Sequence, residues 1–343
     1  MATNMLGEVI CVFSVFLICV LAAVALLLSR RCRSRGSLSP EEEDEGSGRA
    51  VLVTGCDSGF GHHLARRLDD QGFTVFAGCL LPEDHGAQSL ARESSSRLRV
   101  VKLDVTIDDD VEQAKEVIQH SLPEKGLWAV VNNAGISDWA ETEWSTIDHY
   151  SHMIDVNLLG CIRTTIAFLP LVRASKGRIV YVSSIFAFFN CLNMGAYSVS
   201  KRGLEAFADC LRVEMASFGV KVSIIQPGNF GQATNILKMK TSWEIWETLD
   251  KECKQIFNRE YIELANEYFL SMSRSGLTDV NLVIDAMYHA ITSPWPKYRY
   301  LLVSRLDMFF FGFYQLLPTF VTDAIFTLSP MYAKRKKMLY LKQ

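Results

Sequence analysis

Residues Ala50–Gly61 read AVLVTGCDSGFG, and this stretch indicates the fold class more clearly than any other. The apolar run Ala50–Val53 leads into a glycine-rich turn, Thr54–Gly61, and a helical pattern then continues as far as Gly72. Glycines let a backbone approach a pyrophosphate, and the first turn of a helix offers free N–H groups and a partial positive charge. The order of strand, glycine turn and helix therefore predicts a dinucleotide-binding unit.

Further apolar runs alternate with helical patterns along the chain. They predict strands at Phe73–Cys79, Val100–Val105, Leu127–Val131, Arg178–Ser184 and Val220–Gln226, with helices such as Val111–Ser121 and Ala196–Gly219 between them. This alternation is typical of a parallel sheet that is covered by helices on both faces. We therefore expect an α/β, doubly wound Rossmann fold.

The end of the second strand bears on the choice between NAD and NADP, because it approaches the adenosine ribose in such a fold. The strand ends at Cys79, acidic residues follow at Glu83 and Asp84, and the glycine turn carries Asp57. No basic residue is present there for a 2′-phosphate, so NAD is the expected cofactor, although the strand end itself lacks the usual carboxylate. Asp104, at the end of the third strand, either contacts the adenine or only solvates the strand end.

The N-terminus predicts a membrane anchor, residues 1–30. Val9–Leu28 contains no charged side chain, and twenty residues at 1.5 Å each span about 30 Å of hydrocarbon. A cleaved signal peptide normally begins with a basic region, yet Met1–Glu8 has no Lys or Arg, and a mitochondrial presequence is rich in Arg. Both alternatives, and a buried core helix, are weaker interpretations than an uncleaved single-pass helix.

Basic residues follow this segment and none precedes it, namely Arg30, Arg31, Arg33 and Arg35. The positive-inside rule then places the rest of the chain in the cytosol if the membrane is that of the endoplasmic reticulum, the mitochondrial inner membrane being the other candidate. Residues 31–48 form a linker, because Ser37–Gly48 is rich in Ser, Gly and acid and cannot bury apolar surface.

Composition excludes some functional classes. A net charge of −3 gives no sign of nucleic-acid binding, and the nine cysteines are scattered without metal-ligand spacing, so no metal is expected. Scattered cysteines suit reduced thiols. The residues from Arg49 onward are sufficient for one catalytic domain, 49–293, and a C-terminal extension, 294–343.

Tyr197 and Lys201 are the best candidates for catalysis. Residues four apart share one helix face, so the phenol and the ammonium can point into one site. Lowering a phenol pKa from about 10 to about 7 takes roughly 4 kcal/mol. An ammonium about 4 Å away supplies on the order of 4 kcal/mol at an effective dielectric of 20, and an oxidised nicotinamide adds a second positive charge. Tyr197 is then a general acid/base, with the Ser184 hydroxyl holding the substrate oxygen, whereas the pair alone would also suit an ordinary helix surface.

The ordered set of motifs resembles the short-chain dehydrogenase/reductase family over Arg49 to about Ser293. The matching motifs are TGxxxGxG at Thr54–Gly61, Asn132-Asn133-Ala134-Gly135, Asn157, Ser184, Tyr197-x-x-x-Lys201 and Pro227-Gly228. An ordered set of this length is highly specific. It implies the Rossmann fold, a nicotinamide cofactor and oxidation of an alcohol or reduction of a ketone.

The resemblance also implies roles for individual residues. Ser184 would bind the reacting oxygen, Tyr197 would transfer the proton, and Lys201 would lower the tyrosine pKa and hold the nicotinamide ribose. Asn157 would hold a water in a proton relay, or could simply cap a helix. The expected cofactor contacts are Thr54, Gly55, Ser58, Gly59, Phe60, Gly61, Cys79, Asp104, Asn133, Ala134, Gly135, Tyr197, Lys201, Pro227, Gly228 and Thr234.

Segments such as CDSGFG, FAGCL and VKVSIIQPGNF resemble the branch of membrane-associated retinol and hydroxysteroid dehydrogenases, which also contains 3-hydroxybutyrate dehydrogenase type 1, the closest in pattern. The substrate stays open. The loop Ile185–Ala196 contains Phe186, Phe188, Phe189, Leu192 and Met194 and no cation, whereas a small hydroxy acid needs a partner for its carboxylate. An apolar loop suits a steroid, retinoid or other lipid alcohol, unless these aromatics only pack in the core.

The C-terminal extension is apolar and aromatic between Leu306 and Leu328, but Asp307, Pro318 and Asp323 interrupt it. These interruptions argue against a simple membrane span. They leave a membrane-dipping or substrate-entry segment, or a hydrophobic subdomain packed on the core. The basic tail, Lys334–Lys337, could meet anionic headgroups or remain solvated.

The leading hypothesis is an NAD-dependent enzyme that interconverts a secondary alcohol and a ketone, similar to 3-hydroxybutyrate dehydrogenase. The alternative is a steroid or retinol dehydrogenase that acts on a lipophilic alcohol. A catalytically silent NAD-binding scaffold in the membrane is the remote alternative. The expected partners are a small-molecule alcohol or ketone and membrane lipid, with a homo-oligomer implied by the resemblance.

Overall fold

The computed structural model describes residues 46–329 apart from 235, 238 and 239, and a few more up to 337 (332–334 and 337). These residues belong to one compact unit, Asp44–Gln343. The expected anchor, residues 1–30, and most of the linker, 31–48, lie outside the described residues.

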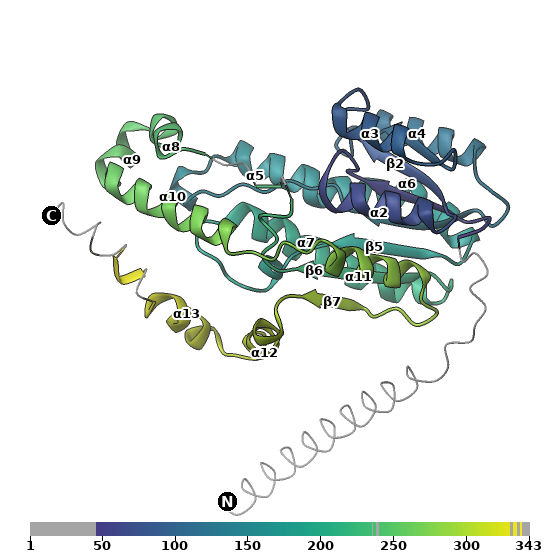
Figure 1. The fold of residues 1–343 in the computed structure, drawn as a ribbon. Helices are drawn as coiled ribbons and strands as arrows, with labels where there is room; N and C mark the ends of the chain where they lie inside the picture. The colour runs from purple at the N-terminus through teal and green to yellow at the C-terminus, as the bar shows by residue number, and fades with distance from the viewer. Residues whose placement is uncertain (1–45, 235, 238–239, 330–331, 335–336, 338–343) are drawn as a thin grey trace, which may run out of the picture. The chain divides into compact units, whose positions relative to one another are not determined.

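The core of this unit is a sheet of parallel strands in the order β3-β2-β1-β4-β5-β6-β7 (Figure 1). The strands are β1 (Ala50–Thr54), β2 (Thr74–Cys79), β3 (Leu98–Lys102), β4 (Leu127–Asn132), β5 (Arg178–Val182), β6 (Lys221–Pro227) and β7 (Arg299–Leu302). β1, β5 and nearly all of β2, β4 and β6 are buried, which is why they appear in the sequence as apolar runs without alternation. The predicted doubly wound α/β fold is confirmed.

Helices cover both faces of the sheet. On one face lie α2 (Gly59–Asp70) and α11 (Asn281–Thr292), and on the other lie α4 (Asp108–His120), α6 (Gly160–Ala174) and α7 (Gly195–Ala216). The α3 helix (His85–Glu93) packs beside β3. Two hydrophobic clusters result, one under each helical layer, and they hold the sheet rigidly in place.

The direction in which strands are added reverses between β1 and β4. At this switch point the loops after the two strands part, and a crevice opens outside their carboxyl ends. The sheet topology therefore places a ligand site beside the glycine turn before any side chain is considered.

Most predicted strand bounds differ from the observed ones by one to three residues, and one strand was not predicted. β3 ends at Lys102, so Asp104 lies in the following loop, where its carboxylate accepts hydrogen bonds from the backbone and hydroxyl of Thr106. β7 lies beyond residue 293, where the sequence placed the end of the catalytic domain, and pairs with β6. Its four residues are too few to stand out from the aromatic sequence around them.

The remaining helices follow the sheet edges. The α5 helix (Ile147–Ile154) leads through a π-helical turn, Asp155–Leu159, into α6. Beyond the sheet, at one end of the unit in Figure 1, lie α8 (Ser242–Thr248), α9 (Lys251–Ile256) and α10 (Arg259–Arg274), while α12 (Arg305–Tyr314) and α13 (Thr319–Thr327) follow β7.

One helical stretch among the described residues, Ile147–Ala174, is long and apolar enough to cross a membrane. Its α6 part packs on β4, β5 and α4, as a helix that covers a sheet does. A third of its most apolar window is buried in this packing.

Candidate active site

A cavity of about 490 Å³ lies at the carboxyl ends of β1, β4, β5 and β6. Its wall combines the glycine turn after β1, the loop after β4 and the Pro227–Gly228 turn with the serine and the tyrosine–lysine pair. Segments that are far apart in the sequence thus meet at the switch point of the sheet. The site can be divided into a nucleotide half and an apolar half.

The nucleotide half is shaped by glycines that nothing larger could replace. Gly55 and Gly59 have φ of +69° and +63°, which favour glycine. A β-carbon at Gly61 would lie 2.3 Å from the carbonyl oxygen of Gly55 and 2.5 Å from Nδ2 of Asn133. The turn is therefore close-packed from below and open toward the cavity.

The N-terminus of α2 forms the end of this turn, and its first helical turn carries no acidic side chain. The Ser58 side chain makes no capping hydrogen bond. Ser58, Gly59 and Phe60 all line the cavity. Free N–H groups and the positive end of the helix dipole suit the pyrophosphate of a dinucleotide, so these residues fit the cofactor that the sequence predicts.

Thr54 and Asn133 hold the two nucleotide loops together. The Thr54 hydroxyl accepts hydrogen bonds from the backbone N–H groups of Asn133 and Ala134, at 3.0 and 2.9 Å. The Asn133 amide in return donates to the carbonyl oxygens of Thr54 and Gly55. Thr54 does not line the cavity, so its position is structural in this arrangement.

Asp57 points from the glycine turn toward the end of β2. Its two carboxylate oxygens each accept a hydrogen bond, from the backbone N–H groups of Leu80 and Leu81, both at 3.1 Å. Asp57 also lines the cavity. A carboxylate therefore stands close to the end of β2 although β2 itself ends in Cys79, a buried thiol that does not reach the cavity.

Ser184, Tyr197 and Lys201 meet in the floor of the cavity. Tyr197 and Lys201 share one face of α7, as predicted, and Ser184 follows β5 and hydrogen-bonds to Tyr197. The Lys201 ammonium donates to the carbonyl oxygen of Val182 at 2.9 Å and lies 5.6 Å from the centroid of the Tyr197 ring. All three side chains are buried.

The sequence led us to expect that Lys201 lowers the pKa of Tyr197. The groups of the protein alone do not produce this shift. Burial raises the pKa of Tyr197 to about 12, and the hydrogen bond from Ser184 only partly opposes this. Burial also lowers the pKa of Lys201, while the nearby Cys161 and Glu205 raise it. Desolvation of the phenol thus sets the direction of the shift, and the Lys201 ammonium donates to the carbonyl oxygen of Val182.

Asn157 is fully buried in the π-helical turn between α5 and α6. Its amide donates to the carbonyl oxygen of Ile136 at 2.8 Å and to the hydroxyl of Ser200 at 3.0 Å, and its Oδ1 accepts from the Ile136 N–H. It thereby joins the loop after β4 to α7, and it is not a helix cap. π-helical turns are frequent at functional sites.

The structure brings most of the expected site residues together. The lining includes Gly55, Ser58, Gly59, Phe60, Asn133, Ala134, Gly135, Ser184, Tyr197, Lys201, Pro227, Gly228 and Thr234. Thr54, Gly61, Cys79, Asp104 and Asn157 are not part of it: Thr54, Cys79 and Asn157 are buried behind the wall, Gly61 packs under the glycine turn and Asp104 lies beyond β3.

The apolar half contains residues that the motifs did not indicate. The predicted aromatic loop supplies Phe186, Phe189 and Met194, whereas Phe188 and Leu192 of that loop lie outside the lining. The rest of this half is formed by Ile236, Leu237, Tyr268, Phe269, Met272, Phe311 and Phe326. They lie on the loop after β6 and on α10, α12 and α13. The apolar character of the C-terminal extension hinted at Phe311 and Phe326, and no sequence signal indicated the others.

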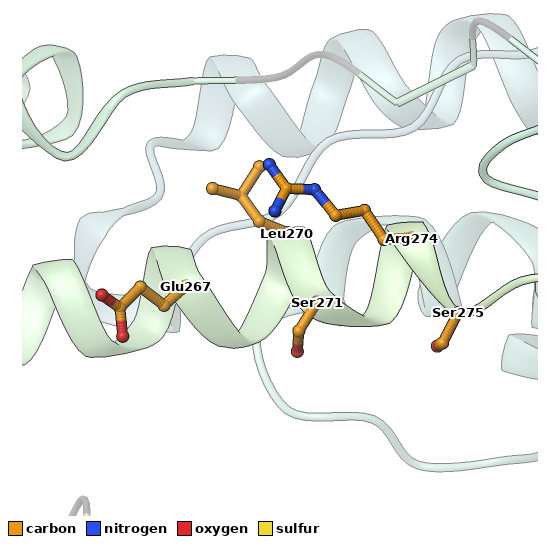
Figure 2. Close-up of a pocket in the computed structure, with 5 residues that line it drawn as sticks. All are labelled: Glu267, Leu270, Ser271, Arg274 and Ser275. Atoms are coloured by element: carbon orange, nitrogen blue, oxygen red, sulfur yellow. The ribbon is translucent and has the colours of Figure 1, made fainter.

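A second hollow lies on the surface of α10 and is lined by Glu267, Leu270, Ser271, Arg274 and Ser275. Figure 2 shows that Leu270 and Arg274 extend to one side of the helix and Ser271 and Ser275 to the other. All five residues belong to one helix and its end, and none converges on a common point. This hollow has no arrangement suited to chemistry.

Comparison with known proteins agrees with the motifs. The family model of the short chain dehydrogenases matches residues 49–245. Mitochondrial D-beta-hydroxybutyrate dehydrogenase from Mus musculus is 42% identical over 76% of this chain and 78% of its own. 17-beta-hydroxysteroid dehydrogenase type 6 from Bos taurus is 41% identical over 81% of this chain and 88% of its own.

A solved structure shares the architecture. A short-chain dehydrogenase from Streptomyces avermitilis superposes with a TM-score of 0.65, at 23% identity, over 81% of this chain and 97% of its own. At this identity the likeness concerns the fold alone.

Proposed function

The chain belongs to the short-chain dehydrogenase family, and we propose that it interconverts a lipophilic alcohol and its carbonyl compound with NAD, the product being a ketone for a hydroxysteroid and an aldehyde for a retinol. The family membership makes it an oxidoreductase with a nicotinamide cofactor. The substrate class, the form of the cofactor and the roles of single residues are our proposals.

Tyr197 is the proposed proton carrier. The Ser184 hydroxyl contacts the same phenol and can hold the alcohol oxygen beside it. When bound, an oxidised nicotinamide supplies hydride acceptance and a positive charge. Since burial raises the pKa of Tyr197 to about 12, that added charge is needed to bring the phenol into a range where it can act as a base.

The apolar half of the cavity carries the proposal on the substrate. Apart from Lys201, which is held by Val182, no cationic side chain is found among the described residues that line it. A bound carboxylate without a partner would cost several kcal/mol. Aromatic and aliphatic side chains with a few polar groups at one end suit a large apolar alcohol such as a steroid or a retinoid.

3-Hydroxybutyrate is a second candidate because the relative from Mus musculus carries that name at 42% identity. The steroid enzyme from Bos taurus is similar to nearly the same degree, 41%. Overall identity therefore does not choose between the two substrates, and the lining of the cavity is the discriminating observation.

A substrate panel tests the proposal directly. We expect NAD-dependent turnover of a hydroxysteroid or a retinol, with kcat/KM at least about a hundred times that for 3-hydroxybutyrate, because the acid has no cation to pair with in the described lining. The measurement is NADH formation by the full chain in detergent or lipid. Efficient use of 3-hydroxybutyrate alone would overturn the lipophilic assignment and leave the second candidate.

Asp57 supports NAD over NADP. It replaces the missing carboxylate at the end of β2, and two backbone amides hold it there. A 2′-phosphate close to this carboxylate would meet a like charge, and two unit charges 4 Å apart interact by about 4 kcal/mol at an effective dielectric of 20. A ribose hydroxyl would instead donate a hydrogen bond to it.

Substituting Asp57→Asn tests this role. We expect the ratio of the NADPH and NADH dissociation constants to fall about tenfold or more, because the repulsion is removed while the side chain keeps its shape. Binding is measured by the fluorescence of the reduced cofactors. Asp84→Asn is the control, because it removes the charge of a nearby residue, the N-cap of α3, and it should leave the ratio unchanged. Equal ratios in wild type and Asp57→Asn would refute the assignment.

The C-terminal helices are the proposed contact with membrane lipid. Leu306, Phe309, Phe313, Leu316, Phe320 and Leu328 are 67–84% exposed. On their other side, Phe311 and Phe326 pack on Phe189 and line the cavity. Exposed lysines, Lys334 and Lys337, follow α13 and can meet anionic headgroups. A lipophilic substrate could thus pass from the bilayer to the cavity.

Tryptophan quenching by brominated lipid tests this contact in the full chain. Phe309→Trp should be quenched in vesicles, because its side chain is 73% exposed on α12. Val117→Trp, at a 51% exposed apolar position on α4, is the matched control and should behave as the parent protein does. Equal quenching of the two variants would exclude α12 as a lipid-facing element.

A further inference from the structure

Glu205 lies on α7, one helical turn beyond Lys201, and no motif indicated it. Its carboxylate is only 12% exposed. It accepts a hydrogen bond from the Ser183 hydroxyl at 2.7 Å and two from the Gln226 amide at 2.9 and 3.1 Å. The guanidinium of Arg299, on β7, lies 3.5 Å away. One carboxylate, largely shielded from solvent, therefore connects β5, β6, β7 and α7 directly behind the cavity.

These contacts form the third member of a regular series. Tyr197, Lys201 and Glu205 follow each other at successive turns of α7 and therefore share one face. They contact three consecutive residues at the end of β5: Tyr197 pairs with Ser184, Lys201 with the carbonyl oxygen of Val182, and Glu205 with Ser183. The first two pairs belong to the proposed active site, and the third has no chemical role in it.

We propose that Glu205 is a positioning residue, which locks the end of β5 to α7 so that Ser184 and Lys201 are held where Tyr197 needs them. This inference rests on the proposed function, because it assumes that Ser184, Tyr197 and Lys201 carry the reaction. Ser183 has no freedom to move once Glu205 holds its hydroxyl, since its backbone N–H also donates to Ile225 at 2.8 Å. Its neighbours on either side are fixed with it.

The charge of Glu205 adds an electrostatic effect. Lys201 is buried, and the groups that act on it are Glu205 from its own helix and the thiol of Cys161 from α6. Burial raises the pKa of Cys161 to about 11, so this thiol is neutral at physiological pH. Glu205 is thus the anion that favours the ammonium form of Lys201, while Arg299 balances the carboxylate from β7.

Asp209, one turn further along α7, provides a matched control. Its carboxylate contacts the same Arg299, at 2.6 Å, and pairs with Arg212, but it touches no residue of β5. Loss of either carboxylate leaves Arg299 with one partner fewer. Only the loss of the Glu205 carboxylate also changes a contact between α7 and the end of β5, the hydrogen bond from Ser183.

The test compares Glu205→Gln with Asp209→Asn in the full-length protein, using an alcohol–ketone pair that the wild type turns over. For Glu205→Gln we expect kcat to fall about tenfold or more with KM nearly unchanged. The acid limb of alcohol oxidation, where Tyr197 must be deprotonated to act as the base, should move down by roughly 0.5 to 1 pH unit, because removing a negative charge lowers the pKa of both Tyr197 and Lys201. Asp209→Asn should show neither change.

Hydrogen exchange supplies a measurement that needs no substrate. The backbone amides of residues 182–187 should exchange faster in Glu205→Gln than in Asp209→Asn or wild type. If both variants match wild type in kcat, pH profile and exchange, the proposal is overturned. It is also overturned if exchange rises while kcat and the pH profile stay unchanged, since Glu205 is then merely structural. If the wild type oxidises no alcohol of the panel, the proposed function fails, and exchange alone decides whether the Glu205 contact holds β5.

Discussion

Replacing Tyr197 by Phe is expected to reduce kcat by about 10²–10⁴-fold, the range that a positioned general acid/base contributes. The ring is buried in the floor of the cavity beside Phe186, 6.1 Å between ring centroids, so phenylalanine fits the same space. Only the hydroxyl that contacts Ser184 is lost. NADH binding should change by less than about threefold, because the nucleotide half of the cavity is untouched.

The measurements are steady-state NADH formation and a fluorescence titration with NADH. Tyr268→Phe is the control, since Tyr268 is a second tyrosine that lines the same cavity, from α10. We expect it to keep kcat within about threefold of wild type. Unchanged turnover in Tyr197→Phe would refute the proposed chemistry, and NADH binding without turnover of any alcohol by the wild type would support the scaffold alternative.

Gly61→Ala is expected to have the largest effect on the cofactor site. The added β-carbon would lie 2.3 Å from the carbonyl oxygen of Gly55 and 2.5 Å from Nδ2 of Asn133. The first of these atoms belongs to the backbone, so the glycine turn itself must shift. Overpacking of this kind costs typically 1–3 kcal/mol, occasionally more, and the shift spoils the turn that faces the pyrophosphate.

We therefore expect Gly61→Ala to lower Tm by several degrees and to weaken NADH binding by at least about a hundredfold. Differential scanning calorimetry and fluorescence titration measure the two effects. Gly312→Ala in α12 is the control, because a β-carbon there meets nothing within 4 Å. A Gly61→Ala protein that binds NADH as wild type does would show that the close contact is relieved without moving the turn.

The order of strands and helices was predictable because a sheet buried on both faces produces apolar runs without alternation. The residues at which the strands end were harder to predict. β7 was missed because its four residues lie in an aromatic region whose composition does not separate strand from helix. Asp104 was placed at a strand end, whereas β3 stops at Lys102 and the loop turns the carboxylate toward Thr106.

The pKa of Tyr197 shows a limit of spacing arguments. Four residues on one helix place Lys201 beside Tyr197, but they do not say which atom the ammonium contacts. The structure directs it to the carbonyl oxygen of Val182 and buries the phenol, and burial raises the pKa of Tyr197 to about 12. The sign of the shift thus depends on desolvation, which is a property of the packed structure.

The fold could be predicted from the sequence, as could the nucleotide turn and the proposed set of Ser184, Tyr197 and Lys201, because these depend on local order and on short, fixed spacings. The side chains that line the apolar half of the cavity could be identified only from the folded structure: α10, α12 and α13 reach the cavity from positions 70 to 130 residues beyond Tyr197. The structure also shows that Glu205 contacts Ser183, since this one carboxylate has partners on or next to separate strands. Contacts of this range depend on how layers pack, and no spacing along the chain records them.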